Sequence, residues 1–214
     1  FNDEELGSLA KYMESNSKGN NTTLHKVNIH SSLAQLGWGE LDIKAIGEPV
    51  LNLKDINGQT ASVQLQRMVS TGSGKSKVYY FVEEVYRIRY TTDRVYLLDF
   101  DRTMTQIPNV NSDIYGNNTI YLGIVAEDIP LMESEDGNVV VFEVANRLCS
   151  YNITTNKLAV IFSFYNEEHG DARSLHMQHG IRILDVNEGG NVQFAVYGYM
   201  NRGRHEGEVG IQLY

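Results

Sequence analysis

The stretch Val192-Gln-Phe-Ala-Val-Tyr-Gly-Tyr-Met200 decides the fold class of this chain. Its most apolar residues recur at every second position, which is the period of a β-strand that places one face on a core. The same period recurs in 61–66, 78–83 and 86–90. The 13 tyrosines of the chain suit the half-buried surface of a pleated sheet. The sequence therefore predicts a protein built mainly of β-strands.

Two other stretches, 138–142 and 158–164, are apolar at nearly every position, which predicts central strands with both faces covered. Turn signals such as Asn57-Gly58 and Asp136-Gly137 separate the strand-forming stretches. The pattern amounts to about a dozen short strands, at the regular spacing that is typical of sandwiches, barrels and propellers.

The first 23 residues differ from the rest of the chain. Leu6, Leu9 and Met13 form an apolar stripe at helical spacing, and the polar run 15–23 follows it. We therefore expect a short helix and a linker in 1–23, and one β-rich domain in 24–214.

A weak internal repeat favours one β architecture. Strand, turn and strand follow one another in 151–164 and again in 181–200, and each unit leads into a polar loop that contains Asn, His and Gly. The spacing of the two units is somewhat shorter than the ~40 residues of a propeller blade. We predict an all-β fold of antiparallel sheets of β-propeller type with a short N-terminal helix. The alternative is a two-sheet β-sandwich with a helical appendage.

The C-terminal third carries a resemblance. The run Phe194-Ala-Val-Tyr-Gly-Tyr-Met-Asn-Arg-Gly-Arg-His-Glu-Gly-Glu-Val-Gly-Ile211 resembles a segment of large, uncharacterised cell-envelope proteins of clostridial Gram-positive bacteria. The phrase Ser150-Tyr-Asn-Ile-Thr-Thr-Asn-Lys-Leu158 is similar to the hairpin of propeller repeats. The resemblance covers roughly the last 75 residues, on the scale of two repeats. It implies an exported, membrane-anchored, β-rich protein, and it carries no activity, substrate or catalytic residue.

Charge and composition exclude several partners. The net charge of −9 comes from 27 acidic and 18 basic residues, and nucleic-acid affinity depends mainly on Lys and Arg. With this acidic balance we expect no nucleic-acid partner. No apolar run approaches the ~18 residues of a membrane span, so we also expect no direct membrane insertion by this segment. The single cysteine, Cys149, lies among apolar residues and is predicted to be a buried small hydrophobe rather than a nucleophile.

The chain begins at Phe1 and ends on a strand-like segment at Tyr214. Natural termini are more often polar tails, so we expect both ends to be cuts in a longer protein. With the resemblance, this predicts an extracytoplasmic location and a membrane anchor in a segment outside this chain.

The most unusual polar segment is Arg202-Gly-Arg-His-Glu-Gly-Glu208, which lies between two predicted strands. Its arginines could bind a carboxylate or phosphate through paired guanidinium groups, and binding residues are common on loops. The competing interpretation is a salt-bridge network that satisfies itself within a long hairpin. We take Arg202, Arg204, His205 and Glu206 as candidate binding residues.

Trp38, the only tryptophan, lies between two glycines. An exposed ring would suit sugar stacking or a partner anchor, and we include Trp38 among the candidate binding residues. A core tryptophan at a tight bend is the alternative.

Three chemical motifs are incomplete. Gly72-Ser-Gly-Lys-Ser76 lacks the first glycine of a phosphate-binding loop and leads into a strand, so a hairpin tip is predicted. The cluster of His169, Asp171, His176 and His179 matches no standard metal spacing. Asp99 and Asp101 could be half of an acid–base pair, but they more simply end a strand. We therefore expect no catalytic residues, no metal site and no cofactor.

These observations predict a non-enzymatic binding or protein-interaction module of an exported cell-envelope protein, with a protein or cell-wall carbohydrate as partner. The alternative is a carbohydrate-active hydrolase that uses paired carboxylates such as Asp99, Asp101 or Glu206, since glycosidases need two carboxylates across a cleft.

Overall fold

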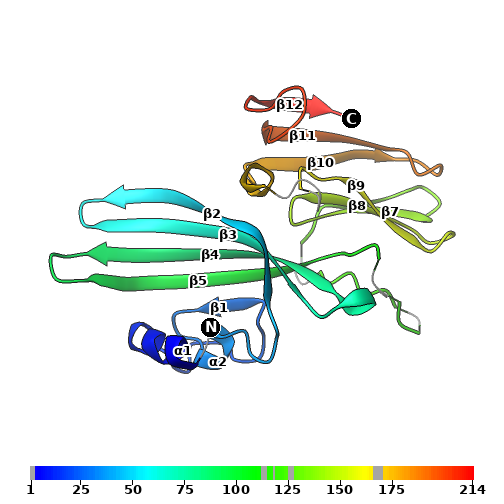
Figure 1. Cartoon of the computed structure of the whole chain (residues 1–214). Helices are drawn as coiled ribbons and strands as arrows, with labels where there is room; N and C mark the ends of the chain where they lie inside the picture. The colour runs from blue at the N-terminus through cyan, green and yellow to red at the C-terminus, as the bar shows by residue number, and fades with distance from the viewer. Residues whose placement is uncertain (1–2, 112–114, 118, 125–127, 166–170) are drawn as a thin grey trace. The chain divides into compact units, whose positions relative to one another are not determined.

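The computed structural model describes residues 3–111, 115–117, 119–124, 128–165 and 171–214. Half of the chain lies in strands, so the predicted all-β character is confirmed. The chain divides into two compact units, Phe1–Gln106 and Ile107–Tyr214, each with its own sheets (Figure 1). The sequence predicted a division between residues 23 and 24, whereas the structure divides between Gln106 and Ile107 and keeps the N-terminal helix in the first unit. None of the helices in the described residues is long and apolar enough to cross a bilayer.

The first unit is built on a five-stranded sheet in the order β1-β5-β4-β3-β2. Its strands are β1 (Lys26–Asn28), β2 (Lys44–Asn57), β3 (Thr60–Thr71), β4 (Val78–Tyr90) and β5 (Val95–Ile107). Four of them are 12 to 14 residues long, and so longer than the short strands predicted. The β3–β4 register runs without interruption from Thr60–Arg89 to Thr71–Val78, because the alternation of side chains continues along both strands. The segment Gly72–Ser76, which resembles part of a phosphate-binding loop, lies in the connection between them and contains the 3₁₀ turn η2 (Gly74–Ser76), so the predicted hairpin tip is confirmed.

Short helices cover one face of this sheet. They are α1 (Asp3–Leu9), the 3₁₀ turn η1 (Ala10–Tyr12) and α2 (Leu33–Leu36), and Figure 1 shows α1 and α2 grouped beside β1. Val27, Ile29, Leu36 and Phe100 form a buried cluster, against which Leu9 packs. The predicted short N-terminal helix is therefore confirmed, and its apolar stripe is the reason it docks.

The second unit contains two antiparallel meanders. The four-stranded sheet runs β6 (Leu131–Glu133), β7 (Val139–Val144), β8 (Arg147–Asn152) and β9 (Lys157–Phe162). The three-stranded sheet runs β10 (His179–Val186), β11 (Val192–Tyr199) and β12 (Val209–Leu213). A buried cluster joins the two sheets: Val139, Val141 and Leu148 of the first, and Ile181, Phe194 and Val196 of the second.

The two predicted central strands had different outcomes. Residues 138–142 fall on β7, which lies between β6 and β8 and is largely buried, as predicted. The prediction for 158–164 was wrong, because β9 is an edge strand and Val160 is exposed. An apolar sequence alone does not tell whether a neighbour covers the second face of a strand. In the described residues the sheets are open, and no closed propeller or barrel is shown.

Candidate functional site

The polar segment 201–208 is the loop that joins β11 to β12. Its base is closed by two main-chain hydrogen bonds, from Met200 N to Glu208 O (2.9 Å) and from Gly207 N to Met200 O (2.9 Å). Gly203 and Gly207 have φ angles of 93° and 87°, a region that favours glycine. The two glycines therefore let the loop bend twice within a short length.

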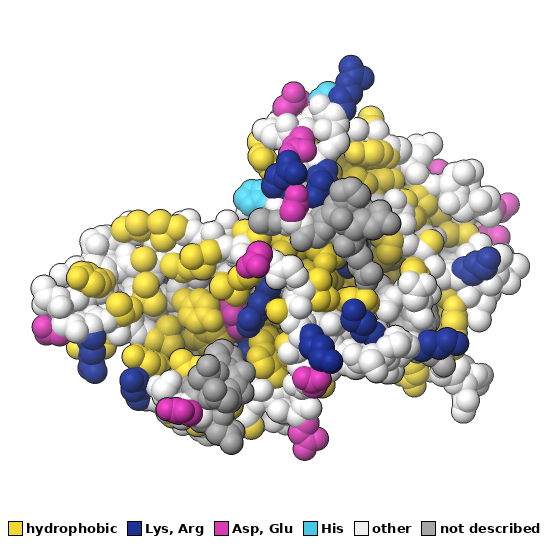
Figure 2. Space-filling model, viewed as in Figure 1, with side chains coloured by type: hydrophobic (Ala, Val, Ile, Leu, Met, Phe, Trp, Pro, Cys, Tyr) yellow, Lys and Arg dark blue, Asp and Glu magenta, His cyan; other side chains and the backbone are white. Residues whose placement is uncertain are grey.

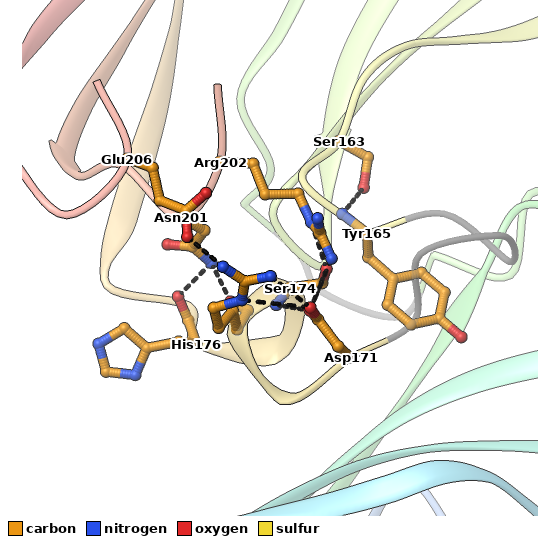
Figure 3. Close-up of polar contacts among 9 residues, drawn as sticks. Ser163, Tyr165, Asp171, Ser174, His176, Asn201, Arg202 and Glu206 are labelled. Carbon is orange, nitrogen blue, oxygen red and sulfur yellow. Dashed lines mark hydrogen bonds and ion pairs between the residues drawn. The ribbon is translucent and has the colours of Figure 1, made fainter. Parts of the chain in front are cut away.

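Asp171 is the centre of the ionic network that holds this loop (Figure 3). Its Oδ1 lies 2.7 Å from Nη2 of Arg202, and its Oδ2 lies 3.1 Å from Nη2 of Arg173. Ser174 donates to Asp171 Oδ1 from both its main-chain N–H (3.1 Å) and its hydroxyl (3.0 Å). Asp171 thus caps the 3₁₀ turn η4 (Ala172–Leu175) and binds the loop at once.

Two further contacts fix the loop to η4. Arg173 forms an ion pair with Glu206, and Arg202 Nε donates to the Ser174 hydroxyl at 2.9 Å. The buried side-chain amide of Asn201 donates to the carbonyls of Arg173 (2.8 Å) and His176 (2.7 Å). The loop is therefore held by a segment that is distant in sequence: Arg202 and Ser174, for example, are 28 residues apart.

The network sets the ionisation of its central carboxyl. Partial desolvation raises the pKa of Asp171, but the hydrogen bonds from Ser174, Arg173 and Arg202 outweigh it and hold the pKa well below its usual range. The carboxylate is therefore charged at every physiological pH. The pKa of Arg173 is raised by its contacts with Asp171 and Glu206, so this side chain stays cationic.

The outer part of the loop faces solvent. Arg204 and His205 are exposed, and His205 Nδ1 lies 3.0 Å from Glu208 Oε2. Beside them is a hollow of about 240 Å³. It is lined by Met200, His205, Glu208, Gly210, Ile211 and Gln212. Figure 2 shows charged side chains gathered over the end of the unit where β11 passes into β12.

The arrangement partly decides between the two interpretations of the loop, a pair of guanidinium groups that binds a ligand and a salt-bridge network within the hairpin. Arg202 and Glu206 are engaged in a salt-bridge network, but their partners lie on Asp171 and η4 rather than within the hairpin. A clamp formed by Arg202 and Arg204 together is not seen, because Arg202 is held by Asp171. Arg204 and His205 are the members of the candidate set that remain directed toward solvent.

Trp38 is buried, with 6% of its surface exposed, so the structure shows the core alternative for this residue. The Arg102 guanidinium lies 3.7 Å from the ring centroid and that of Arg67 lies 5.4 Å away. The ring is therefore not presented for sugar stacking or as a partner anchor. Its φ of 73° lies in the left-handed region, which the packing around it stabilises.

The histidines and the aspartate that crowd together in 169–179 of the sequence have separate surroundings in the described residues. His169 lies outside them, Asp171 is engaged with arginines, and His176 packs edge-on against Tyr199. His179 is buried against Phe164. Within the part of the chain that the structure describes, no group of three or more His, Cys, Asp or Glu side chains is placed to hold a metal ion.

The carboxylates considered for hydrolysis fall in different units. Asp99 and Asp101 lie on β5 of the first unit, and Glu206 lies in the second, where it pairs with Arg173. Burial, followed by the charge of Asp99, raises the pKa of Asp101.

The sequence indicated the loop but missed the residues that hold it. The residue pattern suggests only a metal-ligand role for Asp171, and it gives Ser174 and Asn201 no part in holding the loop. The run Asp171-Ala-Arg-Ser174 carries the signal, since Asp is a preferred cap whose carboxylate accepts from the third residue of a helical turn.

Searches with models of protein families, with curated proteins and with solved structures found no significant match to this chain.

Proposed function

We propose that this chain is a non-enzymatic binding or protein-interaction module of an exported cell-envelope protein, and that the loop 202–208 is its contact site. The observation that carries the proposal is the attachment of this loop to η4 through Asp171, Arg173 and Asn201, which leaves Arg204 and His205 at the surface. A loop that is already ordered loses less conformational entropy when it binds, so the same contacts give higher affinity.

The proposed architecture is propeller-type. It is supported by two successive meanders, β6–β9 and β10–β12, that pack face to face through aliphatic side chains. Adjacent propeller blades stack in this manner, with loops gathered at one end. The proposed location is extracytoplasmic, with a membrane anchor in a segment outside this chain.

The proposed partner is a protein or a cell-wall carbohydrate. Arg204 supplies an exposed cation, and its neighbour in sequence, His205, lines the hollow in which Ile211 supplies an exposed apolar side chain. A guanidinium beside an apolar hollow suits a partner that brings a carboxylate next to an apolar or sugar-ring surface.

Substitution of the exposed cation tests this site. We expect Arg204→Glu to weaken binding at least about tenfold, because one like-charge contact costs more than 1.4 kcal/mol in a desolvated interface. Two separate probes are used: purified cell-wall sacculi with their polysaccharide, and detergent-solubilised envelope proteins of a clostridial bacterium. Binding is measured by sedimentation with the sacculi and by immobilised-chain pull-down with the proteins.

The matched control is Arg182→Glu, an exposed arginine on β10 in the same unit. If both variants bind like the unsubstituted chain, or if both lose binding equally, the loop is not the contact site.

A hydrolase remains the competing proposal, and the raised pKa of Asp101 beside Asp99 is the observation in its favour. Release of reducing ends from wall oligosaccharides, abolished by Asp101→Asn and retained by Glu206→Gln, would support the hydrolase. We expect no release with the unsubstituted chain.

A further inference from the structure

A hollow of about 270 Å³ lies in the first unit between the N-terminal segment and the sheet. Its walls are mostly apolar, and they include Leu9, Tyr12, Met13, Leu97 and Phe100. A concave, mainly apolar space with a few polar groups is the usual form of a small-molecule site. The loop 202–208 belongs to the second unit, so this hollow is a separate feature of the chain.

The spacing of three N-terminal residues creates one wall of the hollow. Tyr12 and Met13 follow Leu9 by three and four positions, so their side chains lie on the same side of this helical segment. Leu9 and Met13 pack against the buried cluster that contains Phe100. Tyr12 is 39% exposed, which places it at the rim. The apolar stripe that docks the segment therefore also shapes the hollow.

The N-terminal segment is attached on both sides of this wall. An added Cβ on Gly37 would lie 2.8 Å from Cδ1 of Leu6, so α1 packs directly against the main chain at the end of α2. Beyond the wall, the main-chain N–H of Glu14 donates to the carbonyl of Ile29 at 2.8 Å. Because closing the hollow would break one of these attachments, the folded unit keeps the space open.

A buried carboxylate forms the polar part of the lining. Glu84 is 4% exposed and lines the hollow. The described residues bring three donor groups to it: the Tyr86 hydroxyl at 3.1 Å, Arg67 Nη2 at 3.3 Å and Arg102 Nη1 at 3.7 Å. These distances exceed the roughly 2.7–2.9 Å of a strong charge-assisted hydrogen bond, and a carboxylate offers about four acceptor positions. Glu84 therefore has room for one further donor from the hollow.

The charges around Glu84 select a neutral donor. An ammonium group that reached this carboxylate would also meet the cations of Arg67 and Arg102. A carboxylate group would meet Glu84 itself, and either ion would lose its hydration between apolar walls. A hydroxyl group has neither problem, whereas an amide would also bring a carbonyl that needs a partner of its own.

We propose that this hollow binds a small neutral alcohol or phenol, whose apolar body packs on Leu9, Leu97 and Phe100 and whose hydroxyl donates to Glu84. At the packing density of a protein interior, the space suits a body of on the order of ten non-hydrogen atoms.

Three probes of similar size test the class of ligand. They are 2-naphthol, 2-naphthoate and 2-naphthylmethylammonium, titrated into the 214-residue chain at pH 7 and followed by calorimetry. We expect saturable binding of 2-naphthol, at least about tenfold tighter than that of either ion, which corresponds to about 1.4 kcal/mol. Absence of saturable 2-naphthol binding, or equal affinity for the three probes, would overturn the proposal.

A substitution that fills the hollow tests its place. Leu97→Trp adds a large side chain to the lining and should weaken 2-naphthol binding at least about tenfold. Leu98→Trp is the matched control on the same strand, since Leu98 is 38% exposed and lies outside the lining given by the described residues. It should leave the affinity unchanged. Urea unfolding of both variants checks that the first unit is folded, and unchanged binding by folded Leu97→Trp would show that the probe binds elsewhere.

Glu84→Gln tests the polar contact. It keeps the shape of the side chain and removes the charge that repels 2-naphthoate, so the tenfold preference for 2-naphthol should fall to about threefold or less. A preference that stays at tenfold in the folded variant would exclude Glu84 as the acceptor. If this variant does not fold, the Leu97 and Leu98 variants and the three probes still decide. Arg204→Glu should leave 2-naphthol binding unchanged, so this site and the loop 202–208 can fail independently.

Discussion

Arg102 is fully buried in the first unit and links three elements. Its guanidinium donates to the carbonyls of Gln35 (2.5 Å) and Leu36 (3.0 Å) at the end of α2, and it lies 3.7 Å from Glu84 Oε1. Burial lowers the pKa of Arg102 to about 10, and the Glu84 carboxylate opposes this shift. Trp38 packs on the same guanidinium. This single residue therefore holds the helical cap of the sheet in place.

We expect Arg102→Met to destabilise the first unit by about 3–5 kcal/mol, because it removes a cation beside the buried Glu84 carboxylate and the guanidinium donor to two carbonyls at the end of α2. Urea unfolding followed by Trp38 fluorescence measures the loss. Arg67→Met, which removes a partly exposed partner of the same Glu84, should cost clearly less. Equal losses in the two variants would contradict this account.

His179 is the corresponding buried ionisable residue of the second unit. It is 7% exposed, and its ring packs edge-on against Phe164 at 4.7 Å. Burial lowers the pKa of His179 to about 4, with a smaller contribution from nearby His176 and an opposing one from the Asn146 main chain. The imidazole is therefore neutral in the folded unit at neutral pH.

This pKa predicts a pH dependence of stability. Between about pH 6.5 and pH 4 the unfolded chain binds a proton that the folded unit does not, so the free energy of unfolding falls as the pH falls through this window. The loss is on the order of 3 kcal/mol, and His179→Leu should remove most of it. The loss of stability is measured by urea unfolding at several pH values, with the labelling of Cys149 by a thiol reagent that is active at acid pH as the probe of unfolding. A slope unchanged in His179→Leu and removed in His205→Gln would contradict the assignment.

At the scale of elements, η4 and the β11–β12 loop form one locked pair. Neither is long enough to be ordered by its own hydrogen bonds, since η4 has four residues and the loop bends at two glycines. Asp171 satisfies the start of η4 and the charge of Arg202 together. The order of each segment therefore depends on the other.

We expect Asp171→Asn to keep the cap of η4 and to loosen the loop. Its cost in global stability should be at most about 1 kcal/mol, because the pair is partly exposed, but amide exchange in 203–208 should accelerate several-fold. Since the pKa of Asp171 is depressed, the stability that the network contributes is fully present above the unfolded pKa of about 4, and it declines as the pH falls from there through the lower folded pKa. Asp185→Asn, an exposed acid on β10, is the control and should leave exchange in the loop unchanged.

At the scale of the whole molecule, each unit has its own core and its own natural reporter. The only tryptophan, Trp38, lies in the buried cluster of the first unit with Val69, Val82 and Met104. The only cysteine, Cys149, is fully buried in the second, and burial raises its pKa to about 11. The predicted role of Cys149 as a small buried hydrophobe is thus confirmed.

Separate cores predict separate unfolding. We expect Phe142→Ala, which truncates a buried side chain next to Cys149, to lower the urea midpoint of Cys149 labelling, with a cost of about 3–5 kcal/mol. The midpoint seen by Trp38 fluorescence should stay unchanged. A shift of both midpoints by the same amount would show that the units unfold as one.

The sequence by itself determined the strand content, the turns and the docked N-terminal helix, because side-chain period and turn residues act over a few positions of the chain. It also marked the loop 202–208 as unusual. Only the tertiary structure decided that β9 is an edge, that Trp38 is covered by Arg102, and that Asp171 holds Arg202. The contacts behind these results connect residues that are far apart in the sequence. Arg202 and Ser174 are 28 positions apart, and Arg102 and Leu36 are 66 positions apart. No local pattern contains such pairs, since they form only when separate elements pack.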